Sequence, residues 1–192
     1  MLALKSLAPA VSVFFLHSPV SAAVLYTTSF GGSEYTLPSG WNAVTGGERT
    51  SSGERGWHID NAGAYRYHYS VATGETGVNG VSTYTGPISG GGDVTNLNDY
   101  ALTTTFRKDT GSNITGLVGH YQDIDNFYHV RLSGTDKLEL YRKDGGSFSL
   151  LQRVFVDAPN LYESGEAWTL QASFESNNIS ANLYNDLDVL VA

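Results

Sequence analysis

The chain has 192 residues, with 19 acidic and 11 basic side chains, a formal charge of -8 and an isoelectric point of about 4.9. This length allows one domain with a sizeable core rather than two. The acidic balance disfavours binding to nucleic acid, to an anionic membrane or to a polyanionic glycan, because each of these requires a surface rich in Lys and Arg.

The N-terminus has the order of a secretory signal peptide. Lys5 precedes a short apolar run at residues 7–16, and small residues follow at positions 20–23. A positive start, an apolar centre and small residues for the peptidase are the three parts of such a signal. The apolar run is too short to remain as a membrane-spanning helix. We therefore predict cleavage near Ala22 or Ala23, a secreted protein, and no membrane span in the mature chain.

The composition indicates an all-β protein. The chain holds 22 glycines and 12 tyrosines, and few windows have apolar residues at helical spacing without an interrupting Gly, Pro or Asn. It has no cysteine, so disulfides cannot hold an exported domain together. Its stability must come from an ordinary core, with a bound ion as a further option.

Short strands are predicted along the N-terminal half of the chain. A turn at residues 37–40 leads to Trp41, and residues 73–92 should be loops apart from one strand near Val81 to Tyr84. The other segments with strand character are Val24–Phe30, Trp57–Asn61 and Ala64–Ser70.

The C-terminal half has a clearer strand pattern. Asp144-Gly145 is a strong hairpin signal between two of these segments. The predicted strands are Tyr100–Phe106, the two arms of a hairpin over 116–132, Leu138–Arg142, Phe148–Phe155, Trp168–Phe174, Ile179–Leu183 and Val189–Val191. Strands at intervals of roughly ten residues, with no helices between them, predict a sandwich or a barrel.

The hairpin over 116–132 is the most informative stretch. Gly119 leaves room for a close neighbour, and the polar residues 122–126 favour a tight turn. After the turn, Tyr128, Val130 and Leu132 alternate with Phe127, His129 and Arg131, which is the period of a half-buried strand.

The sequences Gly116-Leu-Val-Gly-His-Tyr-Gln-Asp and Asn126-Phe-Tyr-His-Val-Arg-Leu resemble a hairpin of concanavalin A-like jelly-roll domains. The chain looks most similar to the thrombospondin C-terminal type and to related laminin-G-like sandwiches of large bacterial exported proteins. The likeness continues at residues 26–30, 37–41, 138–143, 145, 168–172 and 179–183. With the signal peptide at residues 1–22, the likeness implies an antiparallel β-sandwich of the jelly-roll type over 23–192. Such domains continue beyond a segment like 187–191, so we expect that the chain lacks its last strands.

The resemblance also implies a non-catalytic module that recognises carbohydrate or another extracellular surface ligand. Aromatic rings stack on sugar faces, and polar side chains bind sugar hydroxyls. The candidate ligand-binding residues are Trp41, Trp57, Tyr65, Tyr67, His129 and Arg131. Packing in the core is the alternative role for each aromatic residue.

Two other functions remain open. A glycan-cleaving enzyme on the same fold could use the Tyr, His and Arg residues, as a polysaccharide lyase does. The chain has no Glu-x-Asp-x-Glu run of the kind that glucanases of this fold carry, and no Gly-x-Ser-x-Gly motif. The third alternative is a structural or adhesive domain without a small ligand.

The turn of the hairpin is the best candidate for an ion site. Asp123, Asp125 and Asn126 could offer oxygen ligands to Ca²⁺. The same residue types favour a plain turn, because their side chains bond to the local backbone.

Overall fold

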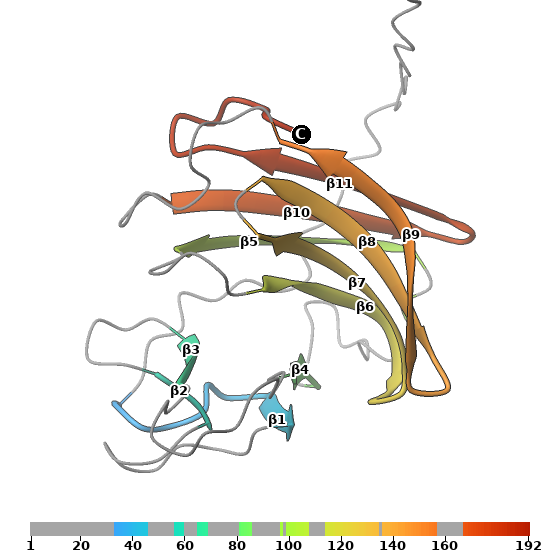
Figure 1. Cartoon of the computed structure of the whole chain (residues 1–192). Helices are drawn as coiled ribbons and strands as arrows, with labels where there is room; N and C mark the ends of the chain where they lie inside the picture. The colour runs from blue at the N-terminus through green and yellow to red at the C-terminus, as the bar shows by residue number, and fades with distance from the viewer. Residues whose placement is uncertain are drawn as a thin grey trace, which may run out of the picture.

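The computed structural model describes residues 33–45, 56–59, 65–68, 81–85, 97, 99–107, 114–134, 136–156 and 167–192. For residues 45, 56–59, 65–68 and 107 the description covers the backbone only. The described secondary structure is made of strands (Figure 1). In chain order they are β1 (Trp41–Thr45), β2 (Gly56–Ile59), β3 (Tyr65–His68), β4 (Val81–Tyr84), β5 (Tyr100–Arg107), β6 (Thr115–Asp123), β7 (Asn126–Ser133), β8 (Lys137–Asp144), β9 (Ser147–Phe155), β10 (Ala167–Glu175) and β11 (Asn178–Tyr184).

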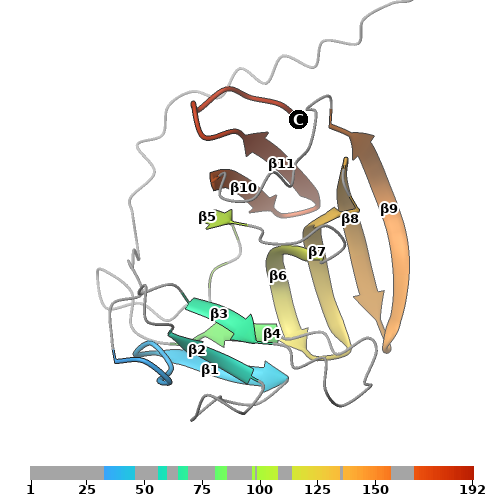
Figure 2. The same ribbon diagram turned by 60° about the vertical axis from the view of Figure 1, so that its left-hand side comes forward.

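The described strands form antiparallel sheets that pack together. The largest has the order β6-β7-β8-β9, and a second has the order β11-β10-β5. These two sheets lie against each other in a sandwich-like arrangement, and the pairs β1-β4 and β2-β3 lie to one side of them (Figure 2). The predicted all-β, antiparallel fold is confirmed at this level.

The hairpin over 116–132 forms as predicted, from β6, a turn and β7. Gly119 does leave room for a neighbour: a Cβ atom at this position would overlap the ring of Phe174 on β10. The space reserved by this glycine therefore lets the two large sheets approach each other at this point.

The predicted hairpin at Asp144-Gly145 is confirmed by the pairing of β8 with β9. Its turn residues, Gly145 and Gly146, both have positive φ angles, 54° and 85°. A two-residue turn of this kind suits the twist of the flanking strands, and glycine adopts it without steric cost.

The main core lies between the two large sheets. Alternate residues of β10 point into it, as the sequence period predicts, and Leu170 and Phe174 are fully buried. The buried members of the core cluster are Val130, Leu132, Leu138, Val156, Trp168, Leu170, Ala172, Phe174 and Leu183.

The last residues fold back along β11. Tyr184 forms a bridge with Leu190, and the backbone N–H and C=O groups of Leu183 bond to Ala192 and Val191. A turn at Asn185 precedes this segment, and its side-chain oxygen accepts the backbone N–H groups of residues 187 and 189. These bonds cover part of the outer edge of β11.

The N-terminal predictions are tested in part. The turn before Trp41 is confirmed by a 3.0 Å hydrogen bond from its N–H to the carbonyl of Pro38. The predicted strands at residues 57–61, 64–70 and 81–84 are also found, as β2, β3 and β4. The predicted strand at 24–30 lies outside the described residues. Within the described part of the chain, no helix has the length and apolar character needed to cross a membrane.

Candidate functional site

An open pocket of about 360 Å³ lies between the four-stranded sheet and the turn that joins β10 to β11. Each strand of the four-stranded sheet contributes one residue to its wall, and the β10–β11 turn with the start of β11 forms the rest. The lining residues are His120, Tyr128, Leu140, Leu151, Ser176, Asn177, Asn178 and Ile179.

The wall of this pocket carries hydrogen-bonding groups without a formal charge. Hydroxyl and amide side chains come mainly from the turn, at residues 176–178, while the aliphatic part is Leu140, Leu151 and Ile179. None of these described lining residues is Asp, Glu, Lys or Arg. The pocket therefore suits an uncharged ligand with both polar groups and apolar surface.

His120 is the most unusual residue of the pocket. It lies at an irregularity of the β6–β7 pairing, with a positive φ of 46°. Its backbone N–H donates a 2.6 Å hydrogen bond to the hydroxyl of Tyr100. Burial raises the pKa of that Tyr100 hydroxyl, although the same hydrogen bond acts in the opposite direction.

The ring of His120 packs among aromatic rings. Its centroid lies 5.4 Å from that of Phe174, 5.6 Å from Tyr100 and 6.0 Å from Tyr128, with edge-to-face geometry in each case. Its Nε2 atom is buried and has no hydrogen-bond partner. A buried polar atom without a partner costs free energy, so a ligand group that reached this nitrogen would relieve that cost. In the structure the atom itself has no surface open to the pocket, although other atoms of His120 line it.

Asp99 positions the turn at the other wall. Its Oδ1 atom accepts hydrogen bonds from the backbone N–H of Ser176 at 2.6 Å and from the Ser176 hydroxyl at 3.3 Å. Ser176 has a positive φ of 49°, which a non-glycine residue rarely adopts. The residue just before β5 thus holds the β10–β11 turn beside the pocket.

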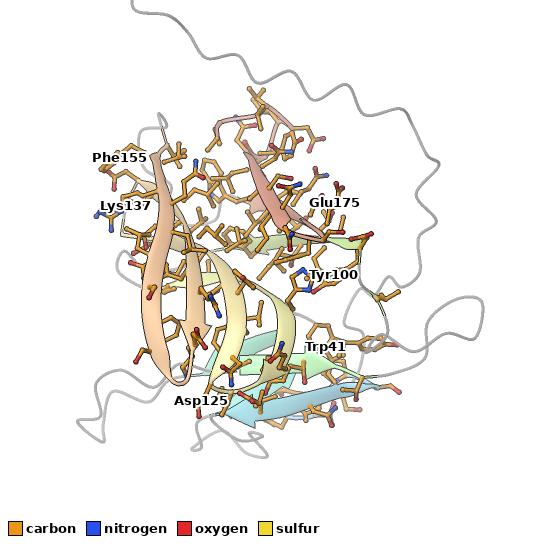
Figure 3. The ribbon with its side chains drawn as sticks, turned by 90° about the vertical axis from the view of Figure 1, so that its right-hand side faces the viewer. Trp41, Tyr100, Asp125, Lys137, Phe155 and Glu175 are labelled. Carbon is orange, nitrogen blue, oxygen red and sulfur yellow. The ribbon has the colours of Figure 1, made fainter. Side chains whose placement is uncertain are left out.

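The predicted aromatic ligand-binding residues lie on the two small sheets. Trp41 is half-buried on β1, and its ring centroid lies 5.8 Å from that of Tyr84. Figure 3 shows Trp41 on a small sheet, apart from Phe155 on β9. In the β2–β3 pair, Trp57 lies opposite Tyr67, and Tyr65 lies opposite Ile59. The side chains of β2 and β3 lie outside the described residues, so their role as ligand-binding residues stays a prediction.

The structure brings His129 and Arg131 together on β7, on the sheet face opposite to Val130 and Leu132. Neither lines the pocket. The Arg131 guanidinium stacks on the ring of Tyr141, 3.8 Å from its centroid. Burial, aided by the charge of Arg131, lowers the pKa of His129 to about 4, so this imidazole is neutral near pH 7.

Glu139 is a structurally important residue that the sequence pattern did not single out. Its side chain is 2% exposed and bridges two arginines, Arg131 at 3.2 Å and Arg153 at 2.6 Å. Burial alone would raise the pKa of Glu139, but the hydrogen bonds and charges of the two arginines outweigh this effect and lower it. Arg131 and Arg153 therefore serve mainly to neutralise the buried carboxylate of Glu139.

The candidate calcium residues bond to each other and to the next hairpin. Asp123 accepts the backbone N–H of Asp125 at 2.8 Å and the side-chain amide of Asn126 at 2.8 Å. The side-chain Oδ1 of Asn126 accepts the backbone N–H of Gly145 at 3.0 Å, and Asp125 pairs with Lys143 at 3.1 Å. Figure 3 shows Asp125 at one end of the four-stranded sheet, with Lys137 and Phe155 at the other. Among the described residues, no group of three or more His, Cys, Asp or Glu side chains could hold a metal ion.

Whether Ca²⁺ binds at Asp123, Asp125 and Asn126 is not settled by these contacts, and thermal unfolding tests it. Because an ion would have to displace the ammonium of Lys143 from Asp125, we expect the same melting temperature in excess chelator and in millimolar Ca²⁺. A melting temperature several degrees lower in chelator would instead support a bound ion. The variant Asp125→Asn, measured in parallel, would then abolish the difference.

The residues of the pocket were not predicted as a group. They come from five strands and a turn, and their separation in sequence reaches 59 residues, from His120 to Ile179. Comparisons with known protein families, with curated proteins and with solved structures give no significant match. The likeness to concanavalin A-like domains is therefore supported only as far as an all-β fold with antiparallel sheets, and no family is identified.

Proposed function

We propose that this chain is an exported, non-catalytic recognition module with a concanavalin A-like jelly-roll fold, and that it binds an uncharged carbohydrate in the pocket beside His120. The observation that carries the proposal is the buried, unpaired Nε2 atom of His120 in a pocket lined by amide and hydroxyl groups. The pattern at residues 5–23 supports export.

A sugar hydroxyl fits the unpaired nitrogen for a simple reason. A hydroxyl can both donate and accept a hydrogen bond, so once a turn of the His120 ring brings Nε2 to the pocket it would satisfy this atom, whichever ring nitrogen carries the proton. The amides of Asn177 and Asn178 also combine donors with acceptors. Leu140, Leu151 and Ile179 can pack against the apolar faces of a sugar ring. The lack of charge among the described lining residues favours a neutral sugar over a uronate or an amino sugar.

The substitution Asn178→Ala tests the site. We expect it to weaken binding of neutral oligosaccharides by about tenfold, because it removes amide hydrogen bonds at the pocket rim. Isothermal titration against a panel of neutral, acidic and amino-sugar oligosaccharides measures this. The matched control is Asn182→Ala, an exposed asparagine on the same strand that does not line the pocket. Both variants should keep the melting temperature of the original protein.

The same panel separates the alternatives. No binding of any oligosaccharide above that of a control protein contradicts the proposal and favours a structural or adhesive domain. The appearance of new reducing ends in the oligosaccharide during the titration would favour a glycan-cleaving enzyme. In that case the neighbouring side chains of His129, Arg131 and Tyr141 are the first to replace.

A further inference from the structure

The pocket beside His120 has two unlike parts, an apolar wall and a polar rim. The wall continues the main core, because Tyr128, Leu140 and Ile179 are half-buried and pack against the core cluster. Leu151 extends the wall outwards from β9, and this side chain is 51% exposed. The wall therefore offers an open hollow in which a small apolar group can leave water.

The rim is formed by three exposed residues of the β10–β11 turn, Ser176, Asn177 and Asn178. Ser176 is bonded to Asp99, which fixes the turn. Within the described part of the chain, no hydrogen bond uses the side-chain amide of Asn177 or Asn178. Each of these amides offers a C=O acceptor and an NH₂ donor to a ligand. Asn178 is followed directly by Ile179, so the rim adjoins the apolar wall.

An acetamido group, which joins an amide to a methyl group, matches both parts of the pocket at once. Its methyl group gains free energy when it leaves water against Leu140, Leu151 and Ile179. Its N–H and C=O groups complement the C=O and NH₂ groups of an asparagine side chain. A hydroxyl in the same place would bond to the rim but would bring no apolar group to the wall.

Charge separates such a sugar from its deacetylated form. Removal of the acetyl group takes away the methyl group and leaves an amine, which is positively charged once protonated. None of the described lining residues is Asp or Glu, so no carboxylate of the pocket wall balances that charge. The pocket therefore favours the acetylated form over the amine.

We propose that the pocket recognises the acetamido group of an N-acetylated neutral sugar, with the methyl group against Leu140, Leu151 and Ile179 and the amide at Asn177 and Asn178. This inference rests on the proposed function, because it names the class of sugar that the carbohydrate site selects. The pocket volume of about 360 Å³ is near the lower end of the range for ligand sites, so it suits a short segment of a glycan.

Isothermal titration with matched ligands tests the proposal. A cello-oligosaccharide and an N-acetylated chito-oligosaccharide of the same length share ring configuration and linkage, and differ in having a hydroxyl or an acetamido group on each ring. We expect the acetylated ligand to bind at least about tenfold more tightly, from the burial of a methyl group and an added amide hydrogen bond. In mildly acidic buffer, the deacetylated chito-oligosaccharide should bind more weakly than the acetylated one. Galactose and N-acetylgalactosamine repeat the comparison on a second ring configuration.

The variant Leu151→Ser tests whether the apolar wall holds the methyl group. It should reduce the preference for the acetylated ligand about threefold, because part of the apolar contact is lost. The matched control is Leu150→Ser: Leu150 is 42% exposed on the same strand and does not line the pocket, so the preference should stay the same. Circular dichroism checks that both variants fold.

Failure of this inference can be told apart from failure of the proposed function. If some neutral sugar binds but the acetylated member is preferred in neither pair, the acetamido assignment is overturned and the carbohydrate site stands. A preference that Leu151→Ser leaves unchanged also overturns the assignment, because the methyl group then lies elsewhere. No binding of any sugar overturns both proposals.

Discussion

The variant Gly119→Ala is expected to unfold with a free energy lower by about 3 kcal/mol or more. A Cβ atom at this position would overlap the ring of Phe174, which is fully buried between the two large sheets. That ring also stacks on Tyr100, with 5.2 Å between centroids, and contacts His120, so it cannot move without disturbing both neighbours. Urea unfolding followed by fluorescence measures the change.

Two further variants show whether overlap with the Phe174 ring causes the loss of stability in Gly119→Ala. Phe174→Leu destabilises the core by itself but removes part of the obstacle, so the loss in the double variant should be clearly smaller than the sum of the two single losses. If the two substitutions are simply additive, the overlap with Phe174 is not the origin of the loss. Gly145→Ala is the control glycine: no atom lies within 4 Å of its added Cβ, and only its positive φ opposes the change. We expect a loss of about 1 kcal/mol there.

Local pattern was sufficient for the hairpins of this fold. The turn at Asp123–Asn126 and the glycines after Asp144 dictate tight turns through their own backbone preferences, and the alternation in β7 and β10 follows from burial on one face. The sequence also predicted that Gly119, a glycine inside a strand, leaves room for a close neighbour. The residue that fills this space, Phe174, is 55 positions away and could not be named from spacing alone.

The features that depend on sheet order were beyond such reasoning. The segment Phe148–Phe155 has the composition of an ordinary half-buried strand, but it is the last strand of a four-stranded sheet, and its side chains are exposed along its whole length. Pairing across strands likewise brings Glu139 beside Arg131 and Arg153, which converts an apparently isolated acid into the centre of a buried ion cluster. The pocket beside His120 forms where the β6-β7-β8-β9 sheet faces the β10–β11 turn and the start of β11. No local signal in the sequence records this contact.

The ion cluster of Glu139 leads to the second large expected effect. Glu139→Gln should lower the free energy of unfolding by about 3 kcal/mol, because the uncharged amide leaves Arg131, only 15% exposed, with no carboxylate to balance its charge. The matched control is Asp144→Asn, which breaks the pair between Arg142 and Asp144. These two side chains are 50% and 61% exposed, so we expect a change below about 0.5 kcal/mol. Urea unfolding at pH 7 compares the two variants.

The pH dependence of this effect identifies its cause. The pKa of Glu139 is lowered in the folded protein, below its ordinary value of 4.5. The stabilisation by its charge is therefore fully present above that value and is lost as the pH falls through the lower, folded-state pKa. Protonation of His129, whose pKa is lowered to about 4, destabilises the fold below about pH 6.5 in both proteins and largely cancels in the comparison. The difference in stability between the original protein and Glu139→Gln should thus persist from pH 7 to about pH 5 and shrink in more acidic solution. A difference that stays constant down to pH 2 would mean that the shape of the side chain, and not its charge, holds the two arginines in place.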